Sequence, residues 1–74
     1  MEYKERIITD PKIMLGKPVI KGTRIAVELI LRKLSEGIVI EELLKAYPHL
    51  KREDILAALS YSADVISHEE LIAT

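Results

Sequence analysis

The chain has 74 residues, a formal net charge of -1 and no Cys. A domain this small has a core that supplies only about 3 to 5 kcal/mol, and without Cys no disulfide can reinforce it. A charge so near zero gives no overall attraction to nucleic acid. We therefore expect one domain, residues 1–74, that gains stability as a homodimer or higher homo-oligomer or by binding a protein partner.

No apolar run approaches the ~20 residues of a membrane-spanning helix, and residues 1–6 lack the apolar centre of a secretory signal. We therefore expect a cytoplasmic protein without membrane contact. His49 and His68 have no companions at metal-ligand spacing, and Ser60 and Ser62 lie in a helical pattern without a sharp turn to expose them. The sequence thus predicts no metal, no cofactor and no enzymatic activity.

Charge is distributed unevenly along the chain. Residues 1–37 carry eight Lys or Arg against five Asp or Glu, a balance of +3, and residues 38–74 carry three against seven, a balance of -4. The first half could meet an anionic surface that the second half would repel. The alternative is a solvated mixture of charges without a binding role.

Short extended segments are predicted in residues 1–25. Ile7 and Ile8 form one such segment, which ends at an Asp-Pro turn. The stretch PVIKGTRI predicts a β-hairpin in which residues 19–20 pair with residues 24–25, because Gly22 supplies the positive φ of a tight turn. The same glycines and lysines could form a phosphate-binding nest, but they lack the spacing of a P-loop.

Three helices are predicted in residues 26–66. From Ala26 the apolar residues follow the spacing i, i+3, i+4, i+7, and Gly37 suits a left-handed cap that ends this helix. A second helix is expected from Ile40 to Tyr47, where Pro48 ends it. A third helix should begin near residue 51 or 52 and bury one face, formed by Ile55, Ala58, Leu59, Ser62 and Ile66.

The turn YPHLK between the second and third helices is typical of a helix-turn-helix layout. The predicted fold class is mainly α: a three-helix helix-turn-helix bundle preceded by a short N-terminal β-hairpin. Ser67 begins a capping box, SHEE, with Ile66 and Leu71 placed as a hydrophobic staple. Residues 67–74 are therefore expected to form a short C-terminal helical turn or tail.

The motifs of the chain resemble a known family. Asp10-Pro11, Gly16-Lys17-Pro18, Gly22-Thr23-Arg24-Ile25, Tyr47-Pro48 and Glu53-Asp54-Ile55 are similar, in this order, to the small prokaryotic proteins of domain of unknown function family 433. The resemblance covers residues 7–66 and implies a hairpin followed by a helix-turn-helix bundle. It further implies an antitoxin, because many members are encoded beside a nuclease of the PIN type.

The sequence departs from this family at three predicted helix starts. Ala26 stands where proline is common, Val39 where serine is common and Lys51 where threonine is common. The first change loses a residue shaped for a helix start, and the other two lose capping acceptors, each with an expected cost of about 1 kcal/mol.

Two groups of residues are candidates for binding sites. Lys51 and Arg52 open the third helix, where recognition helices contact DNA, and Lys21 and Arg24 could add contacts, although neighbouring carboxylates would repel phosphate. Apolar residues at the edges of helical faces and in the tail could meet a protein partner or complete the core; they are Leu29, Leu56, Leu71 and Ile72.

The resemblance implies an antitoxin of a type II pair that neutralises a PIN-like ribonuclease and could repress its own operon by binding operator DNA. The neutralising segment could be the tail, residues 66–74, or a cation from the first half, such as Lys17 or Arg24, that enters a carboxylate-lined metal site. The alternatives are a stand-alone dimeric helix-turn-helix DNA-binding regulator and a scaffold for an unrelated partner.

Overall fold

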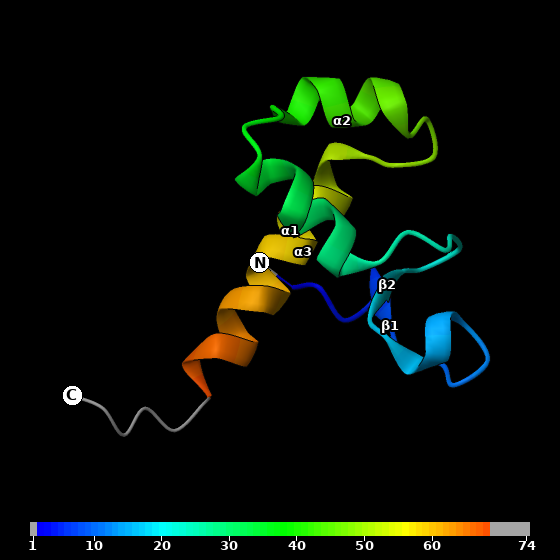
Figure 1. Ribbon diagram of the computed structural model, residues 1–74. Coiled ribbons are helices and arrows are strands. Elements are labelled where there is room, and N and C mark those ends of the chain that lie inside the picture. The colour runs from blue at the N-terminus through cyan, green and yellow to red at the C-terminus, as the bar shows by residue number, and fades with distance from the viewer. Residues whose placement is uncertain (1, 69–74) are drawn as a thin grey trace.

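The computed structural model describes residues 2–68 and confirms the mainly α fold with a short N-terminal hairpin. Strands β1 (Ile7–Ile8) and β2 (Val19–Ile20) flank a single 3-10 turn, η1 (Met14–Gly16), and three helices follow: α1 (Val27–Ser35), α2 (Ile40–Ala46) and α3 (Arg52–Ser67). Helix α3 is the long central helix on which the other elements pack (Figure 1). Helix α1 and the sheet pack along its first half, α2 crosses its N-terminal end, and its last turns project away from the other elements.

The core lies where α1, α2 and the sheet meet the first half of α3. Ile20, Ile30, Leu43 and Ile55 are each at most 2% exposed there. Two small residues of α3, Ala57 and Ala58, are fully buried in the same cluster, and their size lets α1 and β1 approach the helix closely. The core is thus made of aliphatic side chains, as the composition implies.

The hairpin pairs differently from the prediction. Strand β2 pairs antiparallel with β1, Ile7 opposite Ile20 and Ile8 opposite Val19, and this ladder was not predicted. The predicted contact lies on the other edge of β2, where the Ile20 N–H donates to Ile25 O at 2.9 Å and Val19 forms an isolated antiparallel bridge with Ala26. The hydroxyl of Thr23 donates to the Ile20 carbonyl at 2.7 Å and accepts the N–H of Ile25 at 2.9 Å. Since the Thr23 hydroxyl takes the Ile25 N–H, this second pairing has single backbone contacts and does not extend into a regular strand.

The end of α1 follows the prediction. Gly37 has a φ of 92°, its N–H donates to Leu34 O at 3.0 Å, and the N–H of Ile38 donates to Lys33 O at 3.2 Å. This pair of hydrogen bonds is a Schellman motif, which satisfies two carbonyls of the last turn.

The three helix starts lack side-chain caps. Ala26, Val39 and Lys51 occupy the N-cap positions of α1, α2 and α3, and none of these side chains accepts a hydrogen bond from its helix. Only α3 has a compensating contact, because the Asp54 carboxylate accepts the Lys51 N–H at 2.9 Å. The three residues that depart from the family pattern are therefore the N-cap residues of the three helices.

We expect Val39→Ser to stabilise the protein by about 1 kcal/mol, because serine at this N-cap can accept an orphan N–H of α2. The measurement is the midpoint of urea unfolding. Val39→Ala is the matched control, since it removes the half-exposed valine without adding an acceptor. Equal midpoints for the serine and alanine variants would contradict the prediction.

The buried face of α3 is only partly as predicted. Ile55 and Ala58 are buried as expected, but Leu59 is 40% and Ile66 59% exposed, and Ala57 is buried instead. The helix is rotated so that alanine rather than leucine meets the other elements, because only a small residue fits where α1 and β1 come close. The prediction that Leu59 and Ile66 belong to the core is therefore wrong.

Helix α3 also runs farther than predicted. Ser67 is its last residue, and its hydroxyl donates back to Asp64 O at 2.9 Å instead of capping a new helix. The predicted helix start at Ser67 is therefore wrong, and the remainder of that predicted turn, with Leu71 and Ile72, lies outside the described residues.

Candidate functional site

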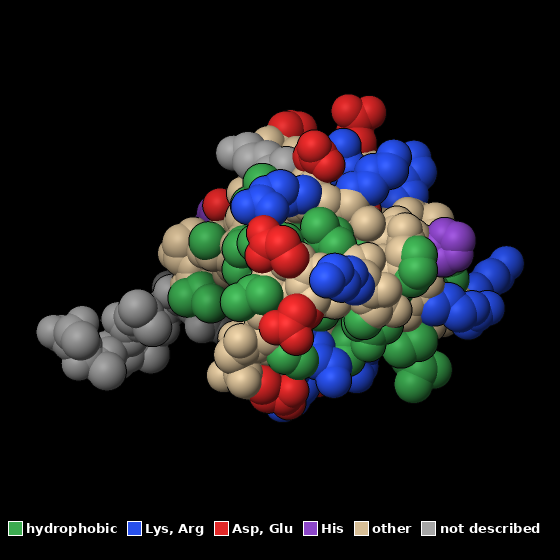
Figure 2. All heavy atoms as spheres, turned by 90° about the horizontal axis from the view of Figure 1, so that it is seen from above, with side chains coloured by type: hydrophobic (Ala, Val, Ile, Leu, Met, Phe, Trp, Pro, Cys, Tyr) green, Lys and Arg blue, Asp and Glu red, His purple; other side chains and the backbone are tan. Residues whose placement is uncertain are grey.

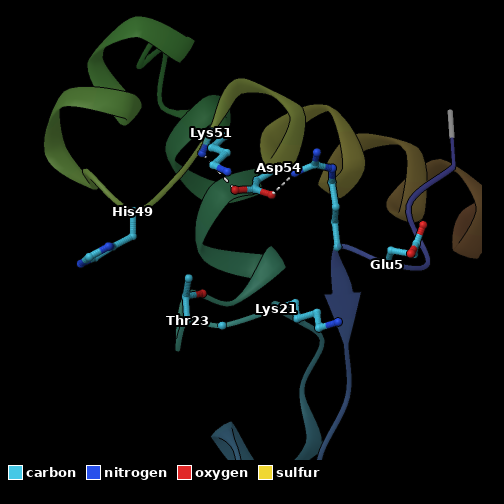
Figure 3. Close-up of a pocket in the computed structure, with 8 residues that line it drawn as sticks. Glu5, Lys21, Thr23, His49, Lys51 and Asp54 are labelled. Atoms are coloured by element: carbon cyan, nitrogen blue, oxygen red, sulfur yellow. Dashed lines mark hydrogen bonds and ion pairs between the residues drawn. The ribbon is translucent and has the colours of Figure 1, made fainter.

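A polar hollow, here called the basic pocket, lies where the N-terminal segment meets the start of α3. Its volume is about 310 Å³, and it is lined by residues from four segments: Glu5, Arg6, Lys21, Gly22, Thr23, His49, Lys51 and Asp54. Figure 3 shows the turn after β2 below the opening and the α2–α3 connection above it. The pocket thus unites parts of the chain that are distant in sequence.

Asp54 joins these segments. Its side chain is 9% exposed, and one carboxylate oxygen accepts the N–H of Lys51 at 2.9 Å while the other accepts Arg6 Nη1 at 3.0 Å (Figure 3). The sequence suggested a carboxylate that would repel DNA, but the structure gives it an ion pair and a capping bond. Its partner Arg6, 48 residues away, left no signal in the sequence.

Lys21 and Lys51 supply the positive charge available in the basic pocket. Neither ammonium group has an ion-pair partner within residues 2–68, so both are available to an anion. The structure therefore brings together two of the four predicted DNA contacts. Arg52 lies outside the pocket and pairs with Glu41 at 3.3 Å, an exposed contact of small energetic value.

A second hollow, here called the Arg24 surface, lies between the η1 loop and α1. It has a volume of about 270 Å³ and is lined by Met14, Lys17, Arg24, Ala26, Glu28, Leu29 and Arg32. Arg24 and Leu29, which the sequence assigned to different partners, lie here together. Arg24 is exposed and forms no ion pair with any described residue, whereas Lys17 is held by Glu28 at 3.1 Å.

The η1 loop places apolar side chains in solvent next to the Arg24 surface. Met14 is 40% exposed and Leu15 94% exposed, and both have left-handed backbone angles, with φ of 52° and 58°. This conformation is unfavourable for residues other than glycine, and such strain concentrates at functional segments. Nothing in the sequence distinguished Leu15 from a core leucine, so this residue was missed.

Glu28 is bound by two cations on the Arg24 surface. Lys17 donates to one oxygen and Arg32 to the other, at 3.1 Å each, and these hydrogen bonds, that from Lys17 first, lower the pKa of Glu28. A carboxyl whose pKa is lower folded than unfolded stabilises the fold above its unfolded pKa, and this contribution disappears as the pH falls through the folded value.

We therefore expect Glu28→Gln to lower the urea midpoint slightly near neutral pH and to match the unsubstituted protein in acid, once the pH is well below the ordinary glutamate value of 4.5. Glu36→Gln, at the end of the same helix, is the control, since Glu36 forms no ion pair with a described residue. A destabilisation by Glu28→Gln that persists unchanged in acid would contradict this assignment.

Two apolar features involve α3. The α1–α3 groove, of about 290 Å³, is lined by Pro18, Val27, Glu28, Leu31, Tyr61, Ser62, Val65 and Ile66. Leu56, Leu59, Ala63 and Ile66 form an exposed row along α3, here called the α3 stripe, which borders the groove at Ile66; Leu56 is 42% exposed. Among the predicted partner-binding residues, Leu56 is thus placed at a surface, and Leu29 is half-buried.

The N-terminal segment is attached to the projecting part of α3. The hydroxyl of Tyr3 donates to Asp64 at 2.8 Å, and its ring meets Tyr61 edge to face, with centroids 5.5 Å apart. The hydrogen bond to Asp64 is the main cause that raises the pKa of the Tyr3 phenol. This contact fixes residues 3–6, and so the position from which Arg6 reaches Asp54.

No candidate metal site and no candidate membrane-spanning helix lies within residues 2–68. In this range no three residues of the types His, Cys, Asp or Glu gather closely enough to hold a metal ion. None of the helices described there has the length and apolar character to cross a bilayer.

Comparison with known proteins identifies similar chains of undetermined activity. The family described as "Protein of unknown function (DUF433)" matches residues 7–62. The uncharacterized protein y4eO of Sinorhizobium fredii is 34% identical over 59 residues, which are 80% of this chain and 27% of that one. An uncharacterized protein of Archaeoglobus fulgidus is 61% identical over 28 residues, 38% of this chain and 78% of that one.

A solved structure shares the fold. The crystal structure of a DUF433 member protein from Anabaena variabilis superimposes with a TM-score of 0.81 at 31% identity, covering 86% of this chain and 63% of that one. This chain thus spans about a quarter of the Sinorhizobium relative and less than two thirds of the Anabaena protein.

Proposed function

This chain belongs to the DUF433 family, and on that premise we propose that it is the antitoxin of a type II toxin-antitoxin pair, which binds and neutralises a PIN-like ribonuclease in the cytoplasm. The proposal assigns the chain no catalytic activity of its own. It also expects a homodimer or higher homo-oligomer, and the antitoxin would repress its own operon by binding operator DNA.

The Arg24 surface carries this proposal. It combines an unpaired guanidinium with the exposed Met14, and the same strained loop holds the neighbouring Leu15 in solvent next to the surface. A nuclease of the PIN type binds its metal through carboxylates, so its site attracts a cation. Arg24 is better suited than Lys17 to enter such a site, because Glu28 already binds Lys17.

The binding mode follows from these two features. Leu15 would fill an apolar recess at the rim of the nuclease site, and Arg24 would pair with its carboxylates, which a planar guanidinium can contact at two points. Desolvated arginines and apolar anchors of this kind supply most of the energy of protein interfaces. This arrangement would block the nuclease site without any chemistry by the antitoxin.

Co-expression with the nuclease encoded by the neighbouring gene tests the proposal. The unsubstituted chain should restore growth and co-purify with the nuclease, whereas Arg24→Glu and Leu15→Glu should each weaken binding by about a hundredfold or more. Lys45→Glu, a charge reversal at an exposed position of α2, is the matched control and should still restore growth. Failure of the unsubstituted chain to bind the nuclease would overturn the proposal.

A stand-alone helix-turn-helix DNA-binding regulator is the second candidate, and the convergence of Lys21 and Lys51 at the start of α3 favours it. Two features oppose it. Between Glu53 and Ile66 the exposed residues of α3 are apolar or acidic, although base readout and phosphate contacts require donors. Acidic and basic side chains are also interspersed on the face shown in Figure 2.

This second function predicts that the purified protein retards promoter DNA with a steep salt dependence, and that Lys21→Ala, Lys51→Ala and Arg52→Ala each weaken binding and reduce the salt slope. Unchanged migration of promoter DNA at low salt would exclude it. The nuclease experiment is independent of that result.

A further inference from the structure

Helix α3 carries apolar side chains beyond the face that it buries. Its inner face buries Ile55, Ala57 and Ala58 against α1 and the sheet, and its outer face carries the α3 stripe. A helix that is apolar all round is normally covered on all sides. We propose that the α3 stripe is covered by α3 of a second copy of this chain, packed antiparallel across a two-fold axis.

The spacing of the α3 stripe is that of a helix-helix seam. Its residues follow one another at intervals of three, four and three, which are the a and d positions of two heptads. In an antiparallel pair, a residues of one helix meet d residues of the other. Leu56 then packs on Ile66 of the partner subunit, and Leu59 packs on Ala63 of the partner subunit.

This pattern is complementary to itself only in the antiparallel orientation. There each small Ala63 faces a large leucine, so the two helices interdigitate without a gap. A parallel pair would place alanine against alanine and leave a void, and it would also bring the Arg52 guanidinium groups of both copies together. An isologous contact of this kind needs no surface other than the stripe.

The charges around the α3 stripe agree with this orientation. The flanking positions hold serine, at residues 60, 62 and 67, so no like charges meet across the axis. The first turn of α3 begins beside Lys51 and Arg52, while its last turn has no basic residue to complement the helix dipole. The antiparallel pair brings these cations to the carbonyl end of the other α3.

Sedimentation equilibrium of the full chain tests the proposal. The unsubstituted protein should behave as a dimer of twice 8.4 kDa. Leu59→Glu and Ala63→Glu should each weaken the dimer at least about tenfold, because each buries an unpaired charge in the seam. Both positions are exposed in the monomer, so circular dichroism should show unchanged helix content. Leu15→Glu, at an exposed leucine outside α3, is the control and should remain dimeric.

Disulfide trapping tests the orientation, and the absence of native Cys makes it unambiguous. When chains carrying Leu56→Cys are mixed with chains carrying Ile66→Cys, oxidation should yield mainly the mixed dimer. Predominant cross-linking of Leu56→Cys chains with themselves would indicate a parallel pair and overturn the proposal.

Three further outcomes would also overturn this inference. They are a monomeric unsubstituted protein, a dimer that Leu59→Glu and Ala63→Glu leave intact, and a dimer lost through Leu31→Glu in the α1–α3 groove instead. The inference does not depend on nuclease binding, which we assign to the Arg24 surface. A monomer that still binds the nuclease through Arg24 would refute the dimer alone.

Discussion

Asp54→Ala should destabilise the protein by about 2 to 3 kcal/mol, because it removes the capping acceptor of α3 and the ion-pair partner of Arg6 together. Against a core worth about 3 to 5 kcal/mol, this loss leaves a net stability of only about 0 to 3 kcal/mol. The measurement is the free energy of unfolding from urea titration. Glu53→Ala, at the adjacent exposed carboxylate, is the control.

Two companion variants separate the contributions at Asp54. Asp54→Asn keeps an oxygen that can accept the Lys51 N–H, so it should recover roughly the 1 kcal/mol of the cap. Arg6→Ala leaves the carboxylate buried without its cation, and a double-mutant cycle with Asp54→Ala should show a clear coupling energy. If Asp54→Ala costs no more than Glu53→Ala, the bridging role of Asp54 is refuted.

Ile55→Ala should cost about 3 kcal/mol, because Ile55 is fully buried and its truncation leaves a cavity that the close-packed α1 and sheet cannot fill. Leu56→Ala is the matched control on the next residue of the same helix. Leu56 is 42% exposed, so at a concentration where the chain is monomeric its truncation should cost less than about 1 kcal/mol. Similar losses for both variants would contradict the orientation of α3.

The sequence was sufficient to predict features that depend only on residues close together in the chain. The three helices and the Gly37 cap follow from apolar spacing and backbone preference within a few residues, and the structure has them where they were expected. The rotation of α3 could not be predicted in this way. Ile55, Ala58 and Leu59 have the spacing of one helical face, so periodicity grouped them together. Tertiary packing turns α3 toward Ala57 and Ala58 and leaves Leu59 at the edge of the buried face.

Contacts between residues that are distant in the sequence could not be predicted either. The pairing of β1 with β2, the bridge from Arg6 to Asp54 and the meeting of Lys21 with Lys51 each join segments that no local pattern connects. Leu15 was missed for a related reason, because its exposure follows from the left-handed turn of η1 and not from its residue type. In the sequence, the residues of the candidate surfaces could therefore be identified only as separate cations and leucines.

The structure of α2 indicates which part of the protein unfolds locally first. This helix has seven residues, places Leu43 alone in the fully buried set and begins at an N-cap without a side-chain acceptor. Its amide hydrogens should exchange with solvent through a local opening far below the global free energy of unfolding. The Lys51 N–H, held by Asp54, should mark the boundary with the buried first half of α3, whose amides we expect to exchange only through global unfolding.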